Sequence, residues 1–194
     1  RPVYKARIKK DEYTNAIDRI CNRYKLGHIK QNESGREYKN RMNKMFSDDV
    51  IQSMKKYSHH GRTSLFGHSV HVSYYNYLIC KFFHWDAVSA ARAGLLHDLY
   101  FYETADYDAT ETHESHSAHH PQVALHNAMQ LFSVNAVEKD IIQNHMWPAT
   151  HHMPHYKESY VIVIVDKYCA ALEYVAPSLR SLFRKVFRRK RAAA

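Results

Sequence analysis

The sequence predicts an all-α protein. Its 194 residues include only 5 glycines and 5 prolines, which is too few for an all-β chain with its frequent turns. Apolar residues recur at helical spacing along most of the chain. One β-branched run, residues 161–165, would suit a buried strand if taken alone. No second strand is predicted to pair with it, so we expect this run to be helical as well.

Two amphipathic helices are predicted near the N-terminus, over residues 11–26 and 39–57. The polar residues 27–38 between them are expected to form the connection. Together, residues 1–61 are interpreted as an N-terminal helical extension packed on the main domain.

A long helix is predicted over residues 63–83, and it carries His68. Asp86 suits the N-cap of the next helix, because its side chain can accept a hydrogen bond from a free backbone N–H. That helix is expected to end near His97 and Asp98. Both candidate metal-binding residues are thus predicted to lie near the C-terminal end of this helix.

The polar residues 101–119 show no helical period and are predicted to form a loop over the site. Pro121 suits the first turn of the following helix, where its missing N–H costs nothing. His120 is then expected at or just before the start of this helix. Another helix is predicted over residues 137–145, ending before Pro148.

The last predicted helix contains residues 161–173, in which the β-branched run continues into a segment with good helix formers. Residues 176–194 form a basic amphipathic helix or tail. Such a tail suits nucleic acid or an acidic membrane surface. We favour an ordinary last helix with its charges in water.

The composition limits the function classes. A net charge of +9 attracts anions of many kinds without selecting one. The 3 cysteines form no C-x-x-C pair, and no signal peptide or bilayer-length apolar run is present, so we expect a soluble cytoplasmic protein. The 16 histidines are unusual, because histidine both binds metals and titrates near neutral pH.

The doublet His97-Asp98 is the first candidate metal-binding motif. A histidine next to an aspartate is weak evidence alone, since such pairs often arise by chance. Here it follows the small, apolar segment 90–96, which must be buried. A buried Asp98 would be costly unless it were paired or bound to a metal.

His68 upstream and Asp166 downstream complete a pattern H…HD…D, with His68 standing in the form H-S-x-x-V and the doublet in the form A-x-L-L-H-D. Over about residues 62–173 the chain resembles the HD superfamily of metal-dependent phosphohydrolases. The resemblance implies an HD-domain helical bundle over residues 62–175. It also implies that His68, His97, Asp98 and Asp166 ligate a metal.

Two further histidines extend the resemblance. His120, followed by Pro121, and His145, at the end of an I-x-x-H sequence, match the positions that ligate a second metal in the binuclear branch. The chain also resembles bacterial diadenosine tetraphosphate hydrolases of this superfamily. In residues 145–148 and 166–170 it resembles small HD-domain hydrolases of Firmicutes more closely. His119 competes with His120 for its position, and we prefer His120 because a proline follows it.

The resemblance implies two divalent transition metal ions, with iron or manganese favoured and zinc, cobalt, nickel and magnesium also compatible. Metal-activated water would then cleave a phosphate ester or anhydride of a nucleotide or similar small molecule. Asp98 would bridge the ions. Lys167, Arg62 and Arg92 are the candidates to hold phosphate oxygens, and Lys167 is the best of them because it adjoins a ligand.

Two alternatives remain open at this point: a di-iron oxygenase of the same superfamily, and a non-catalytic module that binds a nucleotide. Most of the other histidines are predicted to lie on the surface or in loops, and His116 and His119 are also candidates for lining the pocket. This surface group includes His59, His60, His71, His84, His113, His151, His152 and His155. Tyr100, Phe101 and Tyr102 are expected to pack in the core.

Overall fold

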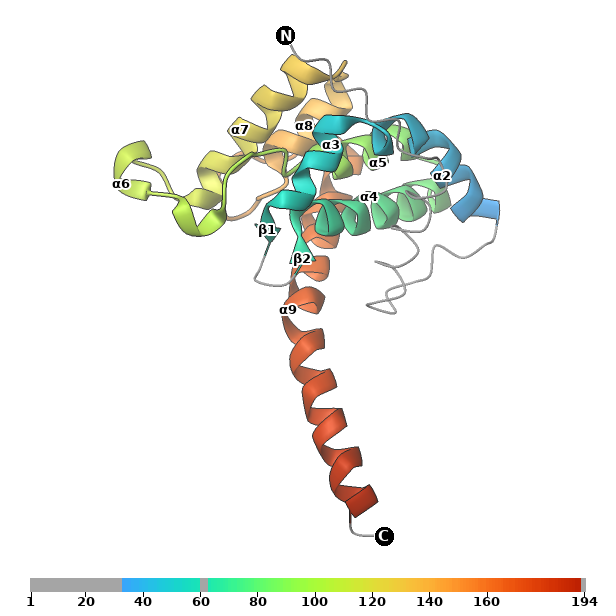
Figure 1. Ribbon diagram of the computed structural model, residues 1–194. Helices are drawn as coiled ribbons and strands as arrows, with labels where there is room; N and C mark the ends of the chain where they lie inside the picture. The colour runs from blue at the N-terminus through green and yellow to red at the C-terminus, as the bar shows by residue number, and fades with distance from the viewer. Residues whose placement is uncertain (1–32, 60–62, 193–194) are drawn as a thin grey trace, which may run out of the picture.

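The protein is built mainly from α-helices in the computed structural model (Figure 1), as the sequence predicts. The structure describes residues 33–59 and 63–192, and it describes their side chains except at residues 104, 111, 112 and 175–192. The helix predicted over residues 11–26 and the candidate phosphate ligand Arg62 lie outside the described residues. The same holds for His60.

The elements follow one another in the order α2 (Glu33–Phe46), α3 (Asp49–Ser53), η1 (Met54–Lys56), β1 (Ser58–His59), β2 (Thr63–Ser64), α4 (Leu65–Phe82), α5 (Ala87–Leu96), η2 (Thr104–Asp106), α6 (Ala109–Thr112), α7 (His116–Leu131), α8 (Ala136–Asn144) and α9 (Lys157–Ala192). The two short strands pair antiparallel and form a hairpin directly before α4.

Side-chain caps set the beginnings of the central helices. Ser64 accepts a hydrogen bond from the backbone N–H of Gly67 at the start of α4. Asp86 accepts one from Ser89 at the start of α5, as predicted. Helix α8 begins with a capping box formed by Asn135 and Glu138. These caps satisfy N–H groups that have no partner inside the helix.

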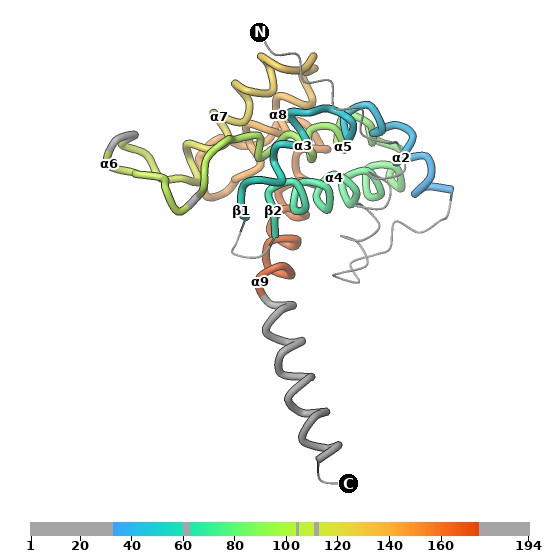
Figure 2. Tube along the Cα trace, viewed as in Figure 1, coloured from blue at the N-terminus to red at the C-terminus, as the bar shows by residue number. Residues whose placement is uncertain are grey.

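Helix α4 forms the centre of the fold. It packs against α5 and α9, while α5 also contacts α8, and α8 contacts α7 and α9. In Figures 1 and 2 these helices gather around the first part of α9, whereas α6 lies at one edge of the molecule. Because neighbours cover α4 on several sides, polar as well as apolar residues of this helix are buried. This burial brings its histidines into the interior.

Helices α4 and α5 approach each other closely at Gly94. A Cβ atom at this position would lie 2.9 Å from the Cα of Ser73 and 2.9 Å from Nδ2 of Asn76. Ser73 also donates a hydrogen bond from its hydroxyl to the carbonyl of Ala91 on α5, at 2.7 Å. The absence of a side chain at Gly94 therefore allows the two helices to pack closely at this point.

Helix α2 begins at Glu33, so the expectation that residues 27–38 form a connection is wrong for 33–38. The reason lies in tertiary packing that the local pattern does not show. Tyr38 is fully buried, its ring packs against Tyr74 and Tyr77 of α4, and its hydroxyl donates to Ser73. The buried ring of Tyr38 thus explains why the polar residues 33–38 belong to a helix that packs on α4.

The segment 101–119 is not a loop throughout, because it contains η2, α6 and the first turn of α7. Helix α7 begins at His116, so Pro121 lies inside the helix and not in its first turn. The prediction that His120 precedes the helix is therefore also wrong. Hydrogen bonds such as the one from His120 Nδ1 to the carbonyl of His116, at 2.8 Å, support the additional turn.

The run 161–165 is helical within α9, which confirms the expectation from its context. Helix α9 continues without interruption from Lys157 to Ala192, past the boundary predicted after residue 175. Among the described residues, no helix combines the length and apolar character needed to cross a membrane.

Candidate metal centre

The six predicted ligands lie close together in the interior, although they come from five helical segments. His68 is on α4, His97 and Asp98 directly follow α5, and His120 is on α7, whereas His145 directly follows α8 and Asp166 is on α9. Each of these residues is buried, with Asp166 the most exposed at 9%. The chain thus gathers four imidazoles and two carboxylates in one place.

One half of the cluster is formed by His68, His97 and Asp166. Oδ1 of Asp166 lies 3.0 Å from Nε2 of His68 and 3.5 Å from Nε2 of His97. Nε2 of His97 is also 3.4 Å from Oδ2 of Asp98. Imidazole nitrogens and carboxylate oxygens thus converge on one small region, and both are ligand types that suit a divalent first-row cation.

The other half is formed by His120, His145 and the second oxygen of Asp98. Oδ1 of Asp98 lies 3.3 Å from Nε2 of His120 and 3.7 Å from Nε2 of His145. This oxygen is buried and has no hydrogen-bond partner among the residues that the structure describes. Asp98 therefore directs one oxygen toward each half of the cluster.

Hydrogen bonds at Nδ1 fix the orientation of three of the rings. His97 donates from Nδ1 to the carbonyl of Gly94 at 2.9 Å, His120 to that of His116 at 2.8 Å, and His145 to that of Ile142 at 2.8 Å. A neutral imidazole whose Nδ1 carries the hydrogen has its lone pair on Nε2. All three Nε2 atoms point into the cluster.

The contact between His120 and His145 tests whether a cation suits this site. Their Nε2 atoms are 2.9 Å apart, and each ring already uses its Nδ1 hydrogen on a backbone carbonyl. Two lone pairs facing each other repel unless a proton or a cation lies between them. Two of the ligand sets, His68 with His97 and Asp98, and Asp98 with His120 and His145, each bring their atoms within 4.8 Å of one another. These buried clusters could hold metal ions.

The electrostatics keep most ligand atoms ready to bind a cation. Burial, together with the neighbouring rings of His97 and His120, lowers the pKa of His145 to about 3. Burial also lowers the pKa of His120. Burial alone would raise the pKa of Asp98, but the surrounding histidines, His97 first, outweigh it and lower that pKa well below the usual range. At neutral pH these two imidazoles are neutral and this carboxylate is ionised.

His68 and His97 differ, because two carboxylates lie close to each of their rings. For His97, burial opposes the protonated form, but Asp98 first and then Asp166 outweigh it and raise its pKa. Burial opposes the protonated form, but Asp166 and Glu173 outweigh that effect and raise the pKa of His68 to about 10. In the absence of a cation, a proton therefore lies on Nε2, between His68 and Asp166. A cation at the site would take the place of this proton.

Of the predicted phosphate-binding cations, Lys167 lies beside the cluster. Its Nζ donates to the carbonyl of His145 at 3.2 Å, and burial lowers its pKa. Arg92 instead pairs with the carboxylate of Glu138 and donates to the carbonyl of Ser133 at 2.8 Å. The structure therefore places Lys167 next to a candidate ligand and engages Arg92 elsewhere.

Two histidines predicted to lie on the surface or in loops are buried, so those predictions are wrong. His59 is 8% exposed and His71 is 2% exposed. The hairpin brings His59 against the first turns of α4, where the ring centroids of His59 and His68 are 4.0 Å apart. Nδ1 of His59 also lies 3.9 Å from Oδ2 of Asp98. Both contacts depend on tertiary packing, for which the local sequence carries no signal.

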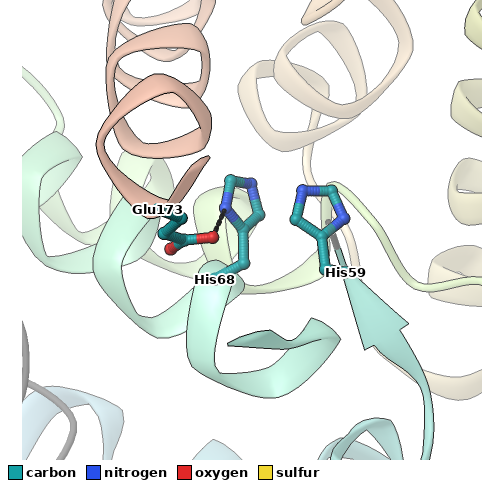
Figure 3. Close-up of side chains that lie close together, drawn as sticks. All are labelled: His59, His68 and Glu173. Atoms are coloured by element: carbon teal, nitrogen blue, oxygen red, sulfur yellow. Dashed lines mark hydrogen bonds and ion pairs between the residues drawn. The ribbon is translucent and has the colours of Figure 1, made fainter. Parts of the chain in front are cut away.

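Glu173 is a buried acidic residue that the sequence analysis did not single out. It comes from α9 and accepts hydrogen bonds from His68 and His71, at 3.2 and 3.1 Å. Figure 3 shows His68 between Glu173 and His59, with the bond to Glu173 dashed. Glu173 follows Asp166 by about two helical turns and so lies on the same face of the helix. That spacing is the signal by which sequence reasoning would have found it.

The aromatic and histidine residues near α7 flank the site. His116 is half-buried and stacks on His120, with ring centroids 4.8 Å apart. His119 instead lies 3.7 Å from the carboxylate of Glu114, so His120 is the residue that joins the cluster. Tyr100 is buried at 1% exposure, which confirms that it packs in the core.

No protein-family model matches the chain, and no match was found among the curated proteins or among the solved structures. The function therefore has to be inferred from the site's own residues and their chemistry.

Proposed function

We propose that this protein is a metal-dependent phosphohydrolase of the HD type with a binuclear metal centre. Its substrate would be a phosphate ester or anhydride of a nucleotide or a similar small molecule. The observation that carries the proposal is the placement of Asp98, whose Oδ2 faces His97 and whose Oδ1 faces His120 and His145. A carboxylate with one oxygen toward each of two ligand groups suits a bridge between two cations.

The donor set favours transition metals. Imidazoles combined with carboxylates suit first-row divalent ions, with iron or manganese favoured over zinc, cobalt, nickel and magnesium. When bound, such ions acidify a water molecule and neutralise phosphoryl oxygens. Asp98 and Asp166 would lower the net charge of the centre, and their burial would keep bulk water from screening that charge.

The positive groups of the chain would hold the phosphate. Lys167 is the best candidate, because its amine lies 3.2 Å from the carbonyl of His145. Arg62 is proposed from the sequence alone. The overall charge of +9 would favour the approach of an anionic substrate.

The first test is the metal content of the protein, purified without chelator and without oxygen. We expect about two equivalents of transition metal per chain and release of phosphate in a screen of nucleotides. A variant with both His97→Ala and Asp98→Ala should lose metal and turnover, whereas His152→Ala, a change at an exposed histidine, should retain both.

Three results would contradict the proposal. Turnover that survives in the double variant would exclude the assigned site. Oxygen uptake with an organic substrate, without phosphate release, would favour the di-iron oxygenase. Failure to bind metal even after it is added back would favour a non-catalytic nucleotide-binding module.

A further inference from the structure

His68 is held in a different way from the other three candidate histidine ligands. His97, His120 and His145 each donate from Nδ1 to a carbonyl three or four residues earlier in the chain. His68 instead has its Nδ1 3.2 Å from Oε2 of Glu173, which is more than one hundred residues away in the sequence. Its orientation depends on a second helix.

A second buried contact holds Glu173 in place. Its side chain is fully buried, and its other oxygen, Oε1, lies 3.1 Å from Nδ1 of His71, one helical turn after His68 on α4. The carboxylate thus spans two histidines of one helix face, and both of its oxygens are engaged. Burying a carboxylate is costly unless partners of this kind compensate.

We propose that Glu173 is a positioning residue of the metal centre. It accepts the Nδ1 hydrogen of His68 and thereby directs Nε2 of this ring toward Asp166, as the nitrogen that binds a cation. Pairs of a carboxylate and a metal-binding histidine work in this way, since the carboxylate selects the tautomer and makes the ring a better donor. The inference rests on the proposed function, because it presupposes a metal at this place.

An alternative role for Glu173 is that of a ligand. Together with His59 and His68 it forms a third set of side chains whose ligand atoms lie within 4.8 Å of one another. A neutral imidazole has one hydrogen and one lone pair. If Nε2 of His68 binds a cation beside Asp166, Nδ1 carries the hydrogen and cannot bind a second ion. The geometry therefore favours positioning over ligation.

The test measures Zn²⁺ affinity and stoichiometry by competition with a chromophoric chelator. Glu173→Gln should weaken Zn²⁺ binding about tenfold to a hundredfold without changing the number of ions bound. Glu158→Gln is a matched control, because Glu158 is also a buried glutamate of α9 but accepts its hydrogen bond from the backbone of Asp86. Its affinity should equal that of the wild type. Loss of one equivalent of zinc in Glu173→Gln would make Glu173 a ligand and overturn the inference.

A double-mutant cycle separates positioning from a general structural effect. If Glu173 acts through His68, Glu173→Ala should cause no further loss of affinity in a His68→Ala background, whereas a structural effect would be additive. Nitrogen NMR of the Zn²⁺-loaded wild type should show the hydrogen of His68 on Nδ1, a result that needs no variant to fold. Additive losses, or a hydrogen on Nε2, would overturn the inference.

The outcome for the wild type distinguishes the two proposals. Wild-type protein that binds no Zn²⁺, Mn²⁺ or Fe²⁺ overturns the proposed function and the inference together. If the wild type and Glu173→Gln bind zinc with equal affinity, only the proposed role of Glu173 is overturned.

Discussion

Replacing Gly94 with alanine should destabilise the protein, although alanine is the better helix former. The added Cβ would lie 2.9 Å from the Cα of Ser73, a backbone atom of α4 that cannot rotate away. Overpacking of this kind costs about 1–3 kcal/mol, and the better helix propensity of alanine returns about 1 kcal/mol. We expect a net loss of about 1 kcal/mol, or a fall in Tm of about 2–4 °C.

The same change should weaken metal binding. The carbonyl of Gly94 accepts the Nδ1 hydrogen of His97, so a shift of α5 away from α4 would also move a candidate ligand. Urea unfolding of the metal-free protein measures the first effect, and Zn²⁺ competition measures the second. Cys80→Ala is the control, because Cys80 is buried near the end of α4. It should lose stability while keeping its affinity for zinc.

Each part of this prediction can be contradicted by experiment. A Gly94→Ala variant that is more stable than the wild type would mean that helix propensity outweighs the contact, and hence that α4 and α5 are not as close as described. Unchanged zinc affinity in a destabilised variant would separate the helix contact from the placement of His97.

Three more predictions concern other parts of the molecule. Burial opposes ionisation of Asp140, but hydrogen bonds, that of Ser159 first, outweigh it and lower its pKa, so its contribution to stability is present above its unfolded pKa and lost as pH falls through the folded value. Asp140→Asn should lower the free energy of unfolding by about 2 kcal/mol at neutral pH. Urea titrations should show this difference shrinking below about pH 4. A constant difference at all pH values would contradict this account. His120→Ala should reduce the metal content from about two equivalents to about one, and elemental analysis showing two would remove His120 from the ligand set. Burial raises the pKa of Cys80 to about 12, so iodoacetamide should modify it only after unfolding, and mass spectrometry showing equal rates in both states would refute its burial.

The fold was predictable where local signals determine it. The cap at Asp86 and the apolar stripes depend on neighbouring residues, so they appear in the sequence itself. The start of α7 was not predictable, because Pro121 is a strong signal for a first turn, and only the tertiary setting accounts for the turn before it. Local pattern and packing disagree here, and packing prevails.

In the candidate site, too, some features follow from the local sequence and others from tertiary packing. His97 and His145 stand directly after helices that the sequence predicts, and both were among the candidate ligands predicted from the sequence. The burial of His59 and His71 follows from how the hairpin and α9 cover α4, and no local pattern encodes that arrangement. Glu173 was predictable in part. Its spacing from Asp166 places it on the same face of the helix, but its hydrogen-bond partners belong to another helix.

The way the histidine rings are held bears on protein design. A ring whose Nδ1 bonds to the carbonyl of its own helix end, as at His97 and His145, takes its orientation from a segment of only a few residues. Such a segment should keep that orientation when it is transplanted to the end of a helix in an unrelated bundle. The ring of His68 would lose its orientation in such a transfer, because that orientation comes from a carboxylate on a different helix. A designer copying this centre would have to carry α4 and α9 over as a pair.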